Sequence, residues 1–344
     1  MDAASLPLVH AMVIAIALNA YVLTGGADFG GGVWDLLASG PRREQQRETV
    51  AKAIGPIWEA NHVWLILVVV VLFTAFPPAF AAISIVLHVP LTLLLLGIVL
   101  RGAAFVFRSY GSPADAAQRR WGRVFAIASV VTPVFLGICV GAIVSGAVGE
   151  RLALVRSGAA GFAAVYVRPW LAPFPLAVGA LTLALFAFLA AVYLTLEAKD
   201  AEVREDFRRR ALAAAAVAAV TALLGVVAGR WGAPRLQAAL LSSAGGILLL
   251  LAAALALATA AWCLWTRRWA LARVAAAALV SLVLWGWVYA QNPMLVPPAL
   301  DVHQAASPPA TLRLLLWALI GGAVILAPSL LYLYRLFSPT APRR

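Results

Sequence analysis

The chain has 344 residues, of which 64% are hydrophobic and only 12% are charged, and its formal net charge is +12. A soluble domain would carry about twice that fraction of charged residues, so the composition excludes a soluble globular protein and indicates an all-α polytopic membrane protein. Most arginines lie in short segments between apolar runs, so the positive charge does not indicate a nucleic-acid surface, and no nucleic acid is expected as a partner.

Apolar segments of about 20 residues or more, long enough to cross a bilayer, recur along the chain. They predict about nine transmembrane helices, at 6–36, 57–77, 79–107, 123–147, 172–196, 210–229, 237–265, 269–290 and 311–336. The loop 148–171 divides them into a first four-helix bundle (1–147) and a second bundle with one extra, peripheral helix (172–344). Residues 197–210 carry mixed charges and are predicted to be a solvated helical connector with no catalytic or binding role.

The basic residues predict the orientation of these spans. Most lysines and arginines fall in the loops after the first, third, fifth and seventh spans and in the C-terminal tail. This alternation places the N-terminus outside and the C-terminus in the cytoplasm, and residues 1–7 lack the basic region of a cleavable signal. The loops predicted on the outer side hold few basic residues: Arg151, Arg156, Arg168, Arg230, Arg235 and Arg313.

Asp28 is an acidic residue within the first span, in the glycine-rich stretch Thr24-Gly-Gly-Ala-Asp-Phe-Gly-Gly-Gly32. Small residues let membrane helices approach closely, so this carboxylate is expected at a tight helix interface. One interpretation makes it an entry point for protons from the cytoplasm, and the other makes it a buried partner for Arg101 or for a group on another subunit. Arg101, at the end of the third span, either reaches the membrane surface or pairs with Asp28 or Glu59, and we favour pairing.

The second span opens with Trp58-Glu-Ala-Asn-His-Val-Trp64, which sets an acid, an amide and an imidazole in an otherwise apolar segment. Glu59 and His62 are three residues apart and hence share a helix face, whereas Asn61 points elsewhere. The pair suits a proton relay; the alternative is that Glu59 caps the helix start and interacts with the helix dipole. A di-iron site is excluded, because the Glu-x-x-His spacing has no second copy.

The remaining histidines and the tryptophans receive structural interpretations. His10, His88 and His303 do not converge in depth as haem ligands would, and we expect them to be packed or interfacial. Trp34, Trp58 and Trp64 lie near predicted span ends, which is typical of the interfacial aromatic belt.

The segments 55–66, 72–77, Ala27-Asp-Phe-Gly-Gly-Gly32, Leu100-Arg-Gly102 and 291–297 together resemble subunit II of the cytochrome bd-type terminal oxidases. The resemblance covers nearly the whole chain in order, and the Trp-acid-x-Asn-x-Val-Trp core is its most specific part. Two departures mark a divergent branch: Gly25 stands where the family commonly has a first acid, and Ala60-Asn61-His62 replaces the common Gly-Asn-Glu.

The resemblance implies a non-haem subunit of a quinol:dioxygen oxidoreductase in the bacterial cytoplasmic (inner) membrane. The partner would be a haem-bearing subunit I with haem b and haem d, or a further haem b, that oxidises quinol and reduces dioxygen to water. This chain would hold no cofactor of its own; a structural quinone or lipid and a small single-span accessory subunit are further candidate ligands and partners. Glu59, His62 and Asp28 would form a proton path, supported by Asn61, Arg101, Trp58 and Trp64.

Two other functions compete with this prediction. The same residues would serve a purely structural subunit if they only fix the contact with the partner. A proton-coupled secondary transporter would instead need interrupted helices repeated in both halves, and the second half has no match for the glycine-rich first span.

Overall fold

The computed structural model describes residues 4–54, 58–110, 116–158 and 161–336, and it confirms an all-α membrane architecture. The helices are α1 (Leu6–Leu36), α2 (Arg43–Ile54), α3 (Trp58–Ala75), α4 (Pro77–Val86), α5 (His88–Tyr110), α6 (Ala116–Val144), α7 (Ala147–Ser157), α8 (Phe162–Tyr166), α9 (Pro173–Glu197), α10 (Ala201–Gly232), α11 (Pro234–Leu241), α12 (Ala244–Trp265), α13 (Trp269–Gln291) and α14 (Pro309–Leu336). Strands β1 (Met294–Val296) and β2 (Leu300–Asp301) form a small antiparallel hairpin between α13 and α14.

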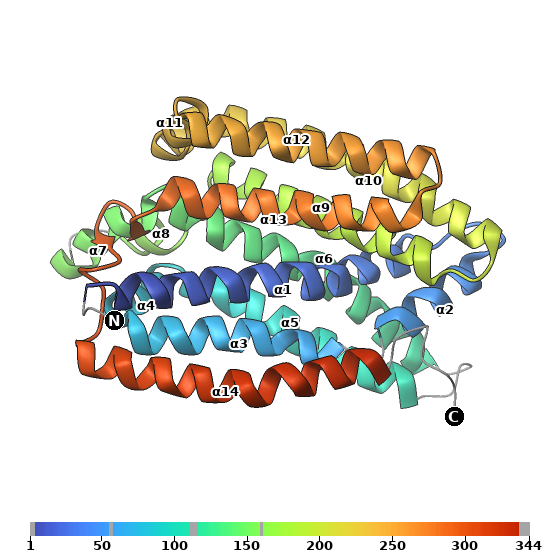
Figure 1. Ribbon diagram of the computed structural model, residues 1–344, viewed down its shortest axis with the longest axis horizontal. Helices are drawn as coiled ribbons and strands as arrows, with labels where there is room; N and C mark the ends of the chain where they lie inside the picture. The colour runs from blue at the N-terminus through green and yellow to red at the C-terminus, as the bar shows by residue number, and fades with distance from the viewer. Residues whose placement is uncertain (1–3, 55–57, 111–115, 159–160, 337–344) are drawn as a thin grey trace.

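The long helices run side by side, with α7, α8, α11 and the hairpin at one end of the bundle and α2 at the other (Figure 1). We call these the α7 end and the α2 end. Among the described residues, eight helices are long and apolar enough to cross a membrane, and the bent pair α2 and α3 would make a ninth. The start of α1 and the end of α14 lie at opposite ends, as an odd number of crossings requires (Figure 1). That the α2 end faces the cytoplasm stays a prediction from the basic residues.

Two of the predicted spans were wrong in detail. The third span is interrupted, because α4 ends at Val86 and α5 begins at His88. Pro90 explains the break, since it has no N–H to donate to the carbonyl of Val86 and its ring crowds that turn. The seventh span is divided into α11 and α12, and the Ser243 hydroxyl caps α12 by accepting a hydrogen bond from the Gly246 N–H at 3.0 Å. The loop 148–171 contains most of α7 and all of α8.

Helix α9 lies in the middle of the molecule and packs against α1, α6, α10 and α13. From Ala184 to Val192 every one of its side chains is buried, which explains why this span is apolar on all sides. The division into two bundles stays a prediction, and in the structure α9 joins helices from both parts. In contrast, α14 lies at the edge against α1 and α3, and the most apolar stretch of α14 has no buried residue.

Candidate functional site

Asp28 of α1 and Arg101 of α5 form a fully buried ion pair. The Arg101 Nη1 donates to Asp28 Oδ2 at 2.9 Å, and Nη2 donates to Asp28 Oδ1 at 2.7 Å. Arg101 is 1% exposed and Asp28 is 5% exposed. Of the partners expected for Arg101, the structure therefore selects Asp28. The two-pronged geometry satisfies both carboxylate oxygens with one guanidinium, which is the strongest form of this interaction.

Arg101 is also held by groups from α6 and from the rest of α1. Its Nε donates to Ser129 Oγ at 3.1 Å, and Ser129 Oγ in turn donates to the Phe125 carbonyl at 2.7 Å. The rings of Phe29 and Phe125 lie 4.7 Å and 5.0 Å from the guanidinium carbon. The charge is thus paired and all three nitrogens donate, so the guanidinium is held in place between α1, α5 and α6.

The glycines of α1 allow this pair to form at a tight helix interface. A Cβ on Gly32 would lie 2.1 Å from Ser129 Oγ, and a Cβ on Gly30 would lie 2.0 Å from the Phe186 carbonyl oxygen. Neither position has room for a side chain, so glycine is required for α1 to approach α6 and α9 so closely. The tight interface predicted around Asp28 is confirmed.

A second group of polar atoms lies between α1 and α3, next to the ion pair. The amide of Asn61 is fully buried, and its Nδ2 donates to the Thr24 carbonyl at 3.4 Å. The His62 ring lies 6.1 Å from the Tyr21 ring and 6.0 Å from the Phe29 ring, centre to centre. Of the buried polar atoms without a hydrogen-bond partner among the described residues, four belong to this part of α1 and α3: Asn19 Oδ1, Asn61 Oδ1, His62 Nδ1 and Trp64 Nε1.

Glu59 differs from its neighbours, because it is exposed in the first turn of α3. It forms no ion pair with another residue of the described part of the chain, and no hydrogen bond joins it to His62 there. The predicted contact between Glu59 and His62 is therefore not formed directly. The position of Glu59 in the first turn of α3 is consistent with the alternative, an interaction of its carboxylate with the helix dipole. The side chain of Trp58 lies outside the described residues.

Among the other singled-out side chains, Trp34 and His10 are buried and Trp64 is half-buried, whereas His88 and His303 are exposed. Trp34 is buried and donates from Nε1 to the Ala187 carbonyl at 2.7 Å, so its predicted place in the interfacial belt was wrong. Trp64 is half-buried against the cluster of Tyr21, Phe29 and Phe186. His10 is fully buried, as expected of a packed histidine, and its Nδ1 lies 2.8 Å from the Leu6 carbonyl oxygen. In the described ranges, no three His, Cys, Asp or Glu side chains gather as metal ligands would.

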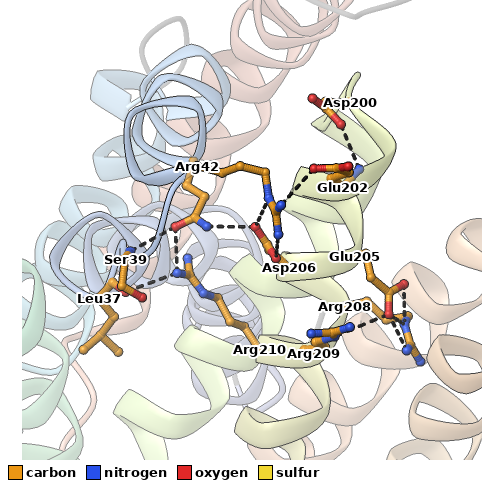
Figure 2. Close-up of polar contacts among 11 residues, drawn as sticks. Leu37, Ser39, Arg42, Asp200, Glu202, Glu205, Asp206, Arg208, Arg209 and Arg210 are labelled. Atoms are coloured by element: carbon orange, nitrogen blue, oxygen red, sulfur yellow. Dashed lines mark hydrogen bonds and ion pairs between the residues drawn. The ribbon is translucent and has the colours of Figure 1, made fainter.

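A network of charged side chains at the α2 end joins α2 and the residues before it to α10 (Figure 2). Arg42 donates to Asp206 from Nε at 2.8 Å and from Nη2 at 2.7 Å, and its Nη1 donates to Glu202 at 2.8 Å. The hydrogen bonds to Asp206 raise the pKa of Arg42 above its usual value. Gln46 donates to Asp206 and accepts from Arg210 Nη2 at 2.7 Å. We call Arg42, Gln46, Asp206 and Arg210 the α2–α10 clamp.

The clamp lies partly in the connector for which the sequence predicted no chemistry. The connector is helical, as predicted, but it is the first part of α10 and begins at the N-cap Asp200. The mixed charges of 197–210 could not predict that Asp206 pairs with Arg42, because the two residues are 164 positions apart. The clamp fixes the start of α2, the helix that precedes Glu59.

The comparison with protein families identifies the chain. The model of the cytochrome bd terminal oxidase subunit II family matches residues 6–337. The chain belongs to this family. The match covers every described helix, including α1, α3 and α5, which carry the site.

Two bd oxidase subunits align with part of this chain. It is 30% identical over 129 residues to the cytochrome bd ubiquinol oxidase subunit 2 of Bacillus subtilis, and this covers 37% of each chain. It is 27% identical over 227 residues to the cytochrome bd-I ubiquinol oxidase subunit 2 of Escherichia coli K12, 64% of this chain and 55% of that one. These alignments thus span about a third to a half of the curated relatives.

The fold of the chain is also known from a solved structure. A chain in the structure of bd oxidase from Geobacillus thermodenitrificans superposes with a TM-score of 0.79 at 22% sequence identity, covering 98% of this chain and 99% of that one. At this identity the match supports the fold alone. It agrees with the all-α membrane architecture derived from the composition.

Proposed function

We propose that this chain is the haem-free second subunit of a quinol-oxidising, dioxygen-reducing complex in the bacterial inner membrane. Family membership over residues 6–337 is the observation that supports this proposal most strongly. The proposed partner is a haem-bearing subunit I that holds haem b and haem d, or a further haem b. The named relatives are ubiquinol oxidase subunits, so a quinol is the proposed electron donor of the complex. The transporter hypothesis has no support in the family match.

Within that complex, we propose that the α2 end of α1 and α3 carries protons inward. Reduction of dioxygen consumes protons, and an enclosed site needs a route for them. The exposed Glu59 would take up a proton at the mouth, and the half-buried His62 lies one turn further along α3. The unpartnered atoms of Asn19, Asn61, His62 and Trp64 support a hydrated route, because buried polar atoms are normally bonded to protein or to ordered water.

The ion pair supports a different role for Asp28. Its carboxylate is bonded through both oxygens to Arg101, and a proton could bind there only by breaking this pairing. Glu59 and His62 have no such partner among the described residues, and they are therefore the better proton carriers. We propose that Asp28 and Arg101 fix the helices beside the route, which combines the relay hypothesis for α3 with the structural hypothesis for α1.

Steady-state oxygen consumption by the purified complex tests this assignment. In the complex, Glu59→Gln and His62→Gln should each lower quinol-driven oxygen consumption by at least about tenfold, the lower range for loss of a proton-transfer group. The haem absorption spectrum should stay unchanged. Glu48→Gln is the matched control, because Glu48 is an exposed acid of α2 that pairs with its helix neighbour Lys52. Full activity of Glu59→Gln would contradict the path, and loss of the haem spectrum would favour a purely structural subunit.

A further inference from the structure

A large cavity at the α7 end is lined by three arginines and one acid. Its volume is about 930 Å³, and it lies among the ends of α6 and α10 and the starts of α7, α9 and α11. Arg151, Arg168 and Arg235 line it together with Glu150, so its charge is positive. Few basic residues are predicted on this side of the membrane, and three of them meet at this one cavity.

Arg151 has hydrogen-bond donors that no group in the described part of the chain uses. Its Nη1 lies 3.9 Å from Glu150 Oε2, too far for a hydrogen bond. Its Nε is buried without a partner in the described part of the chain. A guanidinium has five N–H donors in a planar fork, and this fork fits the oxygens of a phosphate or carboxylate. The cavity therefore offers a binding position for an anion.

A second, apolar cavity of about 210 Å³ adjoins the first. Val144 and Phe174 line both, so the two cavities share a wall. The second is lined from α6, α9, α10, α11, α12 and α13 almost entirely by apolar side chains. The polar lining residue Gln237 already donates from its amide to the Val226 carbonyl. This cavity therefore suits a hydrocarbon chain.

The placement of the two cavities matches the layers of a membrane. The first lies where α6 ends at Val144, α9 begins at Pro173 and α10 ends at Gly232, which is the level of lipid headgroups. Trp231 lines it and is 79% exposed, as interfacial tryptophans commonly are. The apolar cavity is lined further along these spans, at the depth of acyl chains.

We propose that the two cavities bind one anionic phospholipid. The phosphodiester would lie against Arg151, Arg168 and Arg235, and one acyl chain would extend to the apolar cavity. A free phosphate would use only the arginines, and a neutral quinone would leave their charge unmatched. This proposal does not depend on the proton route, which lies at the opposite end of the bundle.

Lipid binding by the full-length chain, purified in its native complex with mild detergent, tests the proposal. After delipidation, phosphatidylglycerol is added back and bound lipid is measured by native mass spectrometry. The triple variant Arg151→Gln, Arg168→Gln, Arg235→Gln should bind phosphatidylglycerol at least about tenfold more weakly, since hydrogen bonds to charged groups are lost. Arg230→Gln is the matched control, because Arg230 is exposed near the end of α10 but does not line the cavity.

A second variant tests the acyl-chain cavity without touching the arginines. Gly225 lines this cavity, and a Cβ placed on it meets nothing within 4 Å, so Gly225→Leu can introduce a side chain at this wall without a clash at its Cβ. It should weaken phosphatidylglycerol binding and leave the arginines intact. The proposal is overturned if the triple variant binds phosphatidylglycerol like the wild type, or if phosphatidylcholine binds equally well. It is also overturned if inorganic phosphate displaces the lipid while Gly225→Leu has no effect.

Discussion

Two arginine–aspartate pairs of nearly equal geometry lie in very different surroundings. Arg101 and Asp28 meet through two hydrogen bonds of 2.9 Å and 2.7 Å within the membrane bundle. Arg42 and Asp206 meet through two of 2.8 Å and 2.7 Å at the α2 end. The side chains of the first pair are 1% and 3% exposed, whereas those of the second are 33% and 16% exposed.

The difference in burial decides what each pair contributes. Charges in a low-dielectric interior interact strongly, but each also loses much hydration, so a buried pair is costly to break on one side only. Charges near water keep an alternative partner in the solvent, and such pairs contribute little to stability. Loss of one partner should therefore strongly destabilise the fold at the buried pair and change its stability little at the exposed pair.

Removal of one buried charge should have the largest effect. Asp28→Asn leaves the Arg101 charge without its partner, and we expect a loss of about 3–5 kcal/mol in the free energy of unfolding. Denaturation of the purified protein in mixed detergent micelles measures this loss. The double variant Asp28→Leu, Arg101→Met should recover most of it, because an apolar pair needs no hydration. Equal losses in the single and double variants would contradict a role for the pairing itself.

A side chain added at the tight contact between α1 and α9 should give the next largest effect. A Cβ at Gly30 would lie 2.0 Å from the Phe186 carbonyl oxygen, a main-chain atom that moves only with its helix. Gly30→Ala should therefore push α1 and α9 apart and cost about 1–3 kcal/mol, as overpacked sites do. The same micelle titration measures it.

Gly122→Ala on α6 is the matched control for that substitution. A Cβ there meets nothing within 4 Å, so alanine should be neutral or mildly stabilising through its higher helix propensity. If Gly30→Ala were equally harmless, the close packing of α1 would not be what positions Asp28.

The sequence predicted the buried pair more readily than the surface network. A charged residue within an apolar span cannot be hydrated by bulk water, so the only groups that could neutralise Asp28 and Arg101 were the few other charged residues in the spans. The charges of 197–210 could be satisfied by water, and their partners depend on how α2 lies against α10. The aromatic faces of Phe29 and Phe125 around Arg101 also could not be predicted, because they follow from helix rotation rather than from spacing.

Hydropathy located the spans but not their breaks. An apolar window stays apolar across Leu87 and across Ser242 and Ser243, although the helices end there. Pro90 was the available signal for the first break. Trp34 was misplaced for a related reason, since its nearness to a span end does not reveal that it bonds to Ala187 within the core.

Asp206→Asn in the α2–α10 clamp should have the smallest effect of the three sites. Asparagine keeps the shape of the side chain, and Arg42 retains both Glu202 and the solvent as partners. We expect a loss of no more than about 1 kcal/mol that shrinks further as salt is raised, because screening weakens exposed pairs. Denaturation at low and high ionic strength measures both, with Glu48→Gln as a control at an exposed ion pair. A salt-independent loss as large as that of Asp28→Asn would mean that the clamp, despite its exposure, behaves as a buried pair.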